Sequence, residues 1–189
     1  WMESAPYIDA PQPNDERERF LTYDEAMRLL GAAHVPHLHT FIALAVWTGA
    51  RAGALYQLKW EHIDPDELLI YWPAGTLNKR RPRVTAINQP LALALGTAAI
   101  LRDSEHVISW RGKPIESIKG VYYRAAAKAK LNDVTIHDLR RTAASWVLMN
   151  GGSFDDAAAL LEDDVRTVQK RYARFNVAYM RGIGDRIAR

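Results

Sequence analysis

Residues suited to chemistry on a phosphate ester occur in the C-terminal half of the chain. His137 and Arg140 lie three positions apart, and Tyr172 follows within an Arg-Tyr-Ala-Arg run. Attack on a phosphodiester requires cations for the phosphate oxygens, a group that transfers a proton, and a hydroxyl nucleophile. Arginine, histidine and tyrosine can supply these three functions respectively, with Tyr172 as the nucleophile.

A second arginine, Arg51, ends a Thr-Gly-Ala-Arg run far upstream. A glycine before an arginine allows a sharp turn that presents the guanidinium group inward. Taken alone, each residue also has an ordinary structural interpretation. Arg51 and Arg140 are then exposed cations, His137 is a helix cap, and Tyr172 is a core residue of an amphipathic helix. A phenol with a pKa of about 10 also needs a base and nearby cations to act as a nucleophile.

His137 and Arg140 are expected near the start of a helix that Thr135 caps and that reaches Asn150, before two glycines. At about 3.6 residues per turn the two side chains lie roughly 60° apart, at the edge of the buried face. Free N–H groups at a helix N-terminus favour an anion there. The face expected to be buried consists of Leu139, Ala143, Trp146, Val147 and Asn150.

The hydrophobic pattern predicts a mainly α-helical domain with one small antiparallel β-sheet (α+β). Thr22 and Glu25 have capping-box spacing, Pro36 suits the first turn of a second helix, and Gly49 ends or bends that helix. The predicted helices cover about residues 23–33, 36–48, 55–60, 90–101, 117–130, 154–161, 165–174 and 177–187. Strands at 68–72 and 83–87 form a hairpin around a turn at 75–81, and 106–109 is a candidate third strand.

Length and composition limit the class of protein. The chain has 189 residues, about half of them apolar, which is enough for one domain with a full core. The absence of cysteine excludes disulfides, thiolate nucleophiles and zinc–sulfur sites. No apolar run approaches the roughly 20 residues of a membrane span, so no membrane partner is expected. No histidine or carboxylate cluster has metal-ligand spacing, and we expect neither a metal nor another cofactor.

The two ends of the chain suggest its organisation. Residues 1–19 are rich in Pro, Asp, Glu and Arg and are interpreted as a linker or disordered segment, whereas 20–189 are expected to form the domain. The first residue, Trp1, is not a natural initiation, so we expect a fragment of a longer protein.

Positive charge is concentrated in one place. The net charge is only +3, yet residues 79–83 carry four cations in five positions. A local basic cluster suits a protein that binds a polyanion with one face. A solvated, charged turn explains the same cluster equally well.

From about Phe20 to the C-terminus, the chain resembles the catalytic domain of the tyrosine recombinases, the phage-integrase family. The matching segments, in order, are Thr48–Arg51, Leu58–Asp64, Arg81–Arg83, His137–Thr142, and Leu160–Leu161 through Arg171–Arg174. The resemblance implies the fold of DNA breaking–rejoining enzymes. It also implies a separate N-terminal domain that closes around DNA and is absent from this chain.

The resemblance assigns catalytic roles by position. Arg51 and Arg140 would clamp the non-bridging oxygens of the scissile phosphate, and His137 would assist proton transfer. Tyr172 would form a 3′-phosphotyrosyl link to DNA. The covalent link conserves the energy of the broken bond, so the reaction needs neither ATP nor a metal.

The basic hairpin and nearby helices would supply the remaining contacts. Lys79 is the best match for the family's lysine, which protonates the departing 5′ oxygen, although direct alignment places Asn78 at that position. Phosphate contacts of this kind set affinity and its salt dependence rather than sequence choice. The expected DNA-binding residues are Arg80, Arg81, Arg83, Arg124, Lys128 and Arg141.

Two positions depart from the family pattern. Asp163 stands where the family has His or Trp, after Glu162 in place of a glycine, and Ala54 stands where an acid is frequent. An ionised Asp163 would repel the phosphate, and it could donate a hydrogen bond only if protonated. Loss of one transition-state donor typically costs on the order of 10²–10³ in rate. We therefore list Asp163 among the catalytic positions and expect slower cleavage.

The resulting expectation is site-specific DNA recombination, or integration, on double-stranded attachment sites. The resemblance implies a tetramer on DNA in the cytoplasm of a bacterial or phage-infected cell, whereas the isolated chain is expected to be a monomer. The alternatives are a DNA-binding module that has lost cleavage, a type IB topoisomerase, and a purely structural helical domain. The last helix, through Tyr179, Met180 and Ile183, could dock onto a neighbouring protomer or pack on its own domain.

Overall fold

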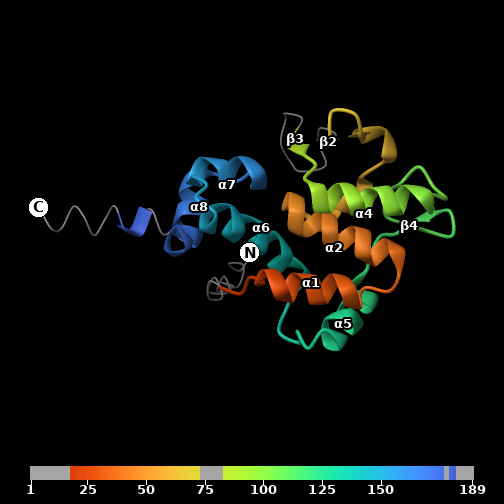
Figure 1. Cartoon of the computed structure of the whole chain (residues 1–189), viewed down its shortest axis with the longest axis horizontal. Coiled ribbons are helices and arrows are strands. Elements are labelled where there is room, and N and C mark those ends of the chain that lie inside the picture. Colours follow the sequence, from red (N-terminus) through yellow and green to blue (C-terminus); the bar gives the residue numbers. More distant parts are fainter. Residues whose placement is uncertain (1–17, 73–82, 177–178, 182–189) are drawn as a thin grey trace, which may run out of the picture.

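The computed structural model describes residues 18–72, 83–176 and 179–181 of the chain. Its helices form two adjoining groups (Figure 1). Helices α1 (Tyr23–Ala32), α2 (Pro36–Thr48), α4 (Gln89–Ile100) and α5 (Lys119–Lys128) form one group. Helix α6 (Ile136–Met149) leads from this group to α7 (Phe154–Leu161) and α8 (Val165–Tyr172), which form the other.

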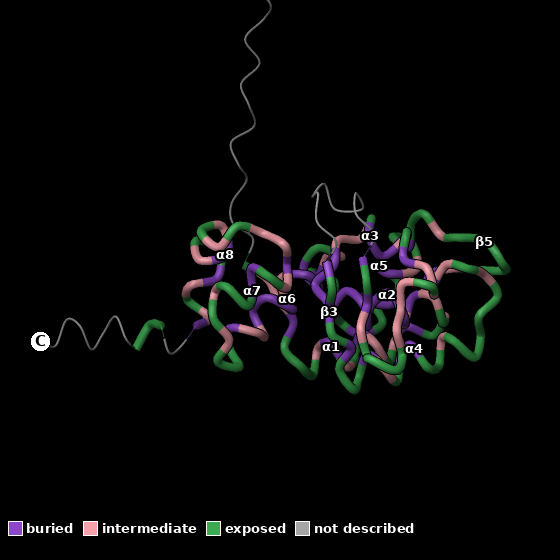
Figure 2. The backbone as a smooth tube through the Cα atoms, turned by 90° about the horizontal axis from the view of Figure 1, so that it is seen from above, coloured by how far each residue is buried: buried purple, intermediate pink, exposed green. Residues whose placement is uncertain are grey.

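The first two helices begin and end as the sequence predicts. The Thr22 hydroxyl accepts from the Glu25 N–H at 3.2 Å, and the Glu25 carboxylate accepts from the Thr22 N–H at 2.9 Å. Helix α2 starts at Pro36, and Gly49 caps its C-terminal end with a φ of 63°, the left-handed conformation that favours glycine. Because most of α2 is buried, it is the central helix of the larger core (Figure 2).

The antiparallel sheet contains the two predicted strands. In this sheet β2 (Leu69–Trp72) pairs with β3 (Arg83–Ala86), which places Trp72 opposite Arg83. The third strand is β1 (Ile63–Asp64), which follows a short 3₁₀ helix at Trp60–His62. The predicted turn between β2 and β3 lies outside the described residues.

The prediction of a strand at 106–109 is largely wrong. Only Ser109 belongs to a strand, β4 (Ser109–Trp110), which pairs with β5 (Lys113–Pro114) in a separate hairpin. Arg111 and Gly112 both have positive φ, 52° and 76°, so the chain reverses there within two residues. Helix α5 also ends earlier than predicted, at Lys128, and Lys130 has a φ of 59°.

The buried face of α6 differs from the predicted face. Leu139 and Ala143 are buried as expected, but Trp146 and Val147 are half-buried and Asn150 is exposed. The face is wider because α2 packs on one side of α6 and α7 on the other. The additional buried residues of α6 are Asp138, Arg140, Thr142, Ala144, Ser145 and Leu148.

Two hydrophobic clusters result from this arrangement. The larger is centred on α2, and the smaller lies between α6, α7 and α8 and includes Tyr172. After Tyr172 the chain continues into a 3₁₀ turn, Ala173–Phe175, rather than a longer helix. Of the predicted last helix, only residues 179–181 are described, and these are helical. The described helices include none with the length and hydropathy of a membrane-spanning segment.

Candidate active site

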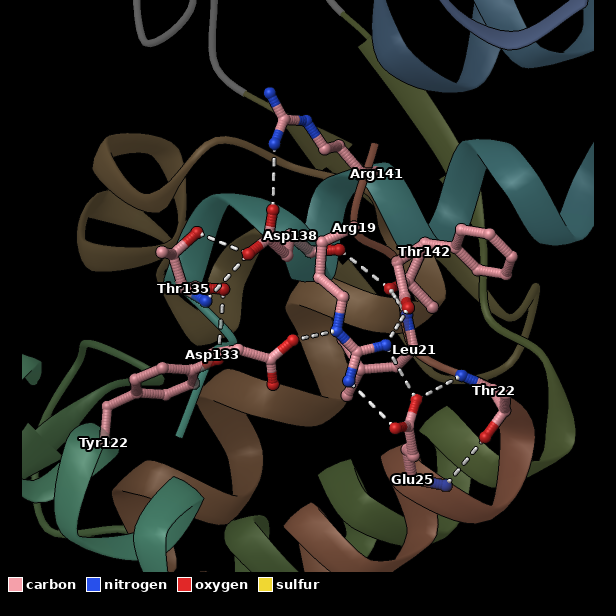
Figure 3. A network of polar contacts seen from close by, with 11 residues as sticks. Arg19, Leu21, Thr22, Glu25, Tyr122, Asp133, Thr135, Asp138, Arg141 and Thr142 are labelled. Atoms are coloured by element: carbon pink, nitrogen blue, oxygen red, sulfur yellow. Dashed lines mark hydrogen bonds and ion pairs between the residues drawn. The ribbon is translucent and has the colours of Figure 1, made fainter. Parts of the chain in front are cut away.

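The first turn of α6 carries His137 and Arg140, and a buried carboxylate holds this turn in place. Asp138 is fully buried. One of its oxygens accepts from the Thr135 N–H and hydroxyl, both at 2.8 Å, and the other accepts from Arg141 at 2.9 Å (Figure 3). Asp138, not His137, therefore completes the cap of this helix. The sequence contains the signal, because Thr135 and Asp138 have capping-box spacing.

Contacts from distant parts of the chain hold the same region (Figure 3). The Leu21 N–H donates to the Thr142 hydroxyl at 2.9 Å, which ties the segment before α1 to α6. Arg19 donates to Asp133 at 2.7 Å and also pairs with Glu25. The Tyr122 hydroxyl of α5 donates to the Thr135 carbonyl at 3.0 Å.

Arg140 is almost completely buried and firmly held. Its Nη1 donates to the Gly49 carbonyl at 2.6 Å, and its Nη2 donates to the Leu161 carbonyl at 2.6 Å. These bonds join α6 to the ends of α2 and α7. The same Nη2 also donates to Asp163 Oδ2 at 2.9 Å.

Arg51 reaches the same place from another direction. It is the N-cap residue of α3 (Ala52–Gln57), just after the left-handed turn at Gly49. Its side chain is 42% exposed, and its Nη2 donates to Asp163 Oδ1 at 2.9 Å. The two arginines, which are far apart in the sequence, thus hold the two oxygens of one carboxylate.

One cleft of about 570 Å³ brings three of the predicted catalytic residues together. Arg51, His137 and Arg140 all line it. Tyr56 and Lys119 line it as well, although no sequence pattern predicted them as site residues. The position of Lys119 at the start of a cationic helix was the only sequence signal for it.

The environment of His137 favours the neutral imidazole. Burial lowers its pKa below the ordinary value, and the positive charges of Arg141 and Arg140 lower the pKa further. The negative charge of Asp138 opposes this shift. A neutral imidazole at neutral pH can accept a proton, as a general base must.

Tyr172 lies at the end of α8 within the smaller hydrophobic cluster, and it is 7% exposed. Burial raises the pKa of its hydroxyl, while the positive charges of Arg141, Arg140 and Arg171 lower it. Tyr172 is therefore both the core residue of the ordinary interpretation and a neighbour of the arginines. Its hydroxyl stays protonated at neutral pH, so nucleophilic attack requires a base.

The departures from the family pattern have clear structural positions. Asp163 accepts hydrogen bonds from two guanidinium groups, which suits an ionised carboxylate rather than a hydrogen-bond donor. Glu162 ends α7 in the left-handed conformation with a φ of 50°, where glycine is favoured. Ala54 is buried in α3 and supplies no acid.

The predicted DNA-binding residues have different surroundings. Arg83 is only 6% exposed and donates to the Thr48 carbonyl, contrary to the expected surface position. Arg141 is paired with Asp138. Arg124 and Lys128 are exposed, but they line a separate groove between α5 and the α1–α2 connection. Lys79, Arg80 and Arg81 lie outside the described residues.

The arrangement can hold a tetrahedral anion. Two guanidinium groups converge on one small anionic group, and the neutral imidazole of His137 lines the same cleft. Tyr172 does not line this cleft, but the charge of Arg140 acts on its hydroxyl. Carboxylate and phosphate oxygens accept the same guanidinium hydrogen bonds. Within the described ranges, no group of three or more His, Asp or Glu side chains is placed to hold a metal ion.

Comparison with protein families gives one match over most of the chain. Residues 19–178 match the model described as the phage integrase family. The integrase of Salmonella phage P22 is 27% identical over 173 residues, a match that covers 79% of this chain and 42% of that integrase. The chain thus spans less than half the length of this relative.

Solved structures with the same fold include recombinases and integrases. XerA recombinase has a TM-score of 0.72 and 26% identity, over 89% of this chain and 64% of that chain. The catalytic domain of bacteriophage HP1 integrase has a TM-score of 0.65 and 21% identity, over 88% and 93% respectively. The Tn1549 transposon integrase in complex with transposon right end DNA has a TM-score of 0.74 and 14% identity, over 93% and 68%.

Proposed function

Because the chain belongs to the phage integrase family, we propose that it cuts and rejoins duplex DNA at specific sites through a covalent link to Tyr172. The observation that carries this proposal is the convergence of Arg51 and Arg140, which each hold one oxygen of the same carboxylate. His137 lines the same cleft, and the charge of Arg140 acts on Tyr172. A scissile phosphate at the position of the Asp163 carboxylate would accept hydrogen bonds from both arginines, and its charge would act on the Tyr172 hydroxyl as that of Asp163 does.

In the cleavage step, the Tyr172 oxygen attacks phosphorus and the bond to the 5′ oxygen of the next nucleotide breaks. His137 accepts the phenolic proton, because burial and nearby cations keep its imidazole neutral. Arg51 and Arg140 stabilise the negative charge that develops on the non-bridging oxygens. The products are a 3′-phosphotyrosyl ester and a free 5′ hydroxyl.

The leaving 5′ oxygen must receive a proton. We assign this role to Lys79, which lies outside the described residues. In the second step, the 5′ hydroxyl of a partner duplex attacks the phosphotyrosyl ester and releases Tyr172. No energy source is consumed, because one phosphodiester bond replaces another.

The wider context of the reaction is also a proposal. Recombination joins two duplexes, and we propose a tetramer of the protein on double-stranded attachment sites in the cytoplasm of a bacterial or phage-infected cell. The P22 integrase is longer than this chain, which supports a further DNA-binding domain in the whole protein. Residues 1–19 would link the two domains.

A second candidate function is DNA binding without cleavage. The specific observation in its favour is Asp163, whose carboxylate occupies both arginines. If Asp163 is not displaced by DNA, the site cannot bind the scissile phosphate.

Covalent trapping tests the proposal. We would incubate the chain with a pool of nicked duplexes of randomised sequence and select DNA that remains attached to protein in denaturant. The proposal predicts adducts that Tyr172→Phe abolishes and that Tyr179→Phe, a change at a tyrosine outside the site, preserves. DNA binding without adducts, together with adducts from Asp163→His, would instead establish the second function.

A further inference from the structure

Arg83 is a buried cation that the proposed mechanism does not use. It is the first residue of β3 and lies opposite Trp72 of β2. Its guanidinium carbon lies 5.4 Å from the centroid of the Trp72 ring. Trp72 is itself buried, and its indole N–H donates to the Thr85 hydroxyl at 3.0 Å. Arg83 therefore rests on a fixed aromatic surface.

The guanidinium group of Arg83 points to the end of α2. Its Nη2 donates to the carbonyl of Thr48, the last residue of that helix. The next carbonyl, that of Gly49, accepts from Arg140 Nη1 at 2.6 Å. The last carbonyls of a helix lack partners within the helix and carry partial negative charge. Two arginines from different elements thus hold two successive carbonyls.

The turn at Gly49 determines where the backbone of Arg51 lies. Gly49 has a φ of 63°, and a Cβ there would lie 2.8 Å from the Leu161 side chain. Two residues later, Arg51 starts α3 with a side chain that is 42% exposed. Apart from its ion pair with Asp163, the partly exposed side chain of Arg51 is positioned by the backbone turn that precedes it.

The charge of Arg83 also acts on the site. Burial lowers its pKa to about 10, and Arg140 and Arg51 lower the pKa as well, while the negative charge of Glu162 raises it. Arg83 Nη1 is buried and has no hydrogen-bond partner among the described residues. A buried cation near two other cations is electrostatically unfavourable unless negative charge lies nearby, and here the carboxylates of Glu162 and Asp163 supply that charge.

We propose that Arg83 is a positioning residue of the site, which fixes the turn that presents Arg51 and strengthens the site's attraction for a phosphodiester. It acts through Thr48 and Arg51 rather than by contact with DNA. This inference rests on the proposed function, because it assigns Arg51 to the scissile phosphate.

The test compares Arg83→Met, which keeps an unbranched apolar stem but removes the guanidinium group, with Arg83→Lys, which keeps a donor and a charge. Arg102→Met is the matched control, since Arg102 also stacks on a tryptophan, Trp60, at 5.7 Å but lies away from the site. Single-turnover adduct formation with a nicked duplex gives the cleavage rate. Binding titrations at several salt concentrations give the salt slope, which is the dependence of DNA affinity on salt concentration. Titration with inorganic phosphate, followed by NMR at the side-chain N–H resonance of Arg51, measures phosphate binding without any need for cleavage.

We expect Arg83→Met to slow cleavage about 10²-fold, the size typical of a misplaced catalytic group. We expect it to weaken phosphate binding about tenfold, as for coupling through an intermediate group. Arg83→Lys should recover most of both losses, and Arg102→Met should match the wild type. The salt slope should not change, whereas loss of a direct phosphate contact would reduce it by about one.

A smaller salt slope in Arg83→Met, or phosphate binding equal to that of the wild type, would overturn the inference. An absent response of Arg51 to phosphate in the wild type would overturn it too. If the wild type forms no adduct with any duplex, the proposed function fails, and the phosphate titration alone decides the role of Arg83.

Discussion

At the scale of single residues, the most consequential feature is the carboxylate of Asp163. It lies between the two guanidinium groups that the proposed reaction assigns to the scissile phosphate. In that proposed reaction, a DNA phosphate would compete with Asp163 for the same donors. Asp163 would then be an internal anion that DNA must displace before cleavage.

Replacing Asp163 by Asn should remove this competition. Asn keeps the shape of the side chain but has no charge, so we expect tighter binding of duplex DNA and faster adduct formation. Asp163→His, which adds a donor, should raise the cleavage rate further, on the order of 10²-fold. Binding titrations and single-turnover trapping measure both effects.

Asp164→Asn is the matched control for this prediction. Asp164 caps α8 by accepting from the Arg166 N–H at 2.9 Å, a role that Asn also fills. The two substitutions change the net charge equally, at adjacent positions. An equal rise in affinity from both would mean that overall charge, not the contact with the arginines, is responsible.

The pH dependence of the site should follow His137. Since burial and then Arg141 lower its pKa, the imidazole should titrate below its ordinary value of about 6.5. Cleavage should therefore persist below that pH and decline only when His137 becomes protonated. Arg141→Gln removes a positive charge, so it should raise the pKa of His137. Titration of the His137 ring resonances by NMR in the free chain measures both values, and a fall of the pKa in Arg141→Gln would contradict this account.

At the scale of elements, the end of α2 determines how the arginines meet. Gly49→Ala would place a methyl group 2.8 Å from Leu161 and 3.2 Å from Ala143, at a left-handed φ. We expect a loss of about 2 kcal/mol or more in the free energy of unfolding. Cleavage should fall more than stability alone explains, because Arg51 follows the turn. Denaturant unfolding and the trapping assay measure the two effects.

Gly96→Ala provides the comparison. Gly96 is exposed within α4, and a Cβ there meets nothing within 4 Å. Alanine should stabilise the helix by about 0.5–1 kcal/mol and leave cleavage unchanged. If both glycine substitutions had the same effect, the special role of the turn at Gly49 would be refuted.

A second element-scale contact joins the start of the domain to the segment after Tyr172. Phe20 packs edge-on against Phe175 with ring centroids 4.8 Å apart, and Glu18 forms an ion pair with Arg174. Because the 3₁₀ turn at Ala173–Phe175 follows Tyr172 directly, these contacts hold the end of α8 against the domain.

Phe20→Ala should loosen this end of α8. Phe20 is half-buried, so we expect a loss of about 1–2 kcal/mol in the free energy of unfolding. Amide hydrogen exchange should accelerate most at residues 172–176. Tyr123→Ala removes an aromatic contact with Tyr122 elsewhere, and it should not affect exchange at these residues. Uniform acceleration across the domain in Phe20→Ala would mean that the contact has no local role.

At the scale of the whole molecule, stability should decrease in mild acid. Burial lowers the pKa values of His37, His39 and His137. Below about pH 6.5 the unfolded chain therefore binds more protons than the folded chain, so stability is lost as pH falls. Carboxylates with lowered pKa values, such as Glu25 beside Arg19, contribute only in stronger acid.

Thermal unfolding between pH 7.5 and 5.5 measures this effect. We expect the melting temperature to fall over this interval. Replacing the three histidines by Gln should flatten the dependence. A melting temperature that rises toward pH 5.5 in the wild type would show that burial does not lower these pKa values.

Local sequence signals were sufficient for most of the secondary structure. The Thr22–Glu25 capping box, Pro36 and Gly49 define helix ends through interactions within a few residues. The predicted span of α7, Phe154–Leu161, is also the observed span. Prediction failed at 106–109, because pairing there depends on a two-residue turn with positive φ at Arg111, a residue type that seldom adopts it.

The sequence by itself determined the residue types of the site and their order. The capacity to act as a nucleophile, a base or a cation depends on the chemistry of each side chain, which the sequence states directly. Only the tertiary structure decided what those side chains contact. Arg83, expected on a DNA-binding surface, is buried between Trp72 and the end of α2, and Asp163 bridges Arg51 and Arg140. These contacts join residues far apart in the chain, and their geometry depends on how α2, α6 and α7 pack. Periodicity and spacing report the faces of one element, whereas the direction of a charged side chain is set by the elements around it.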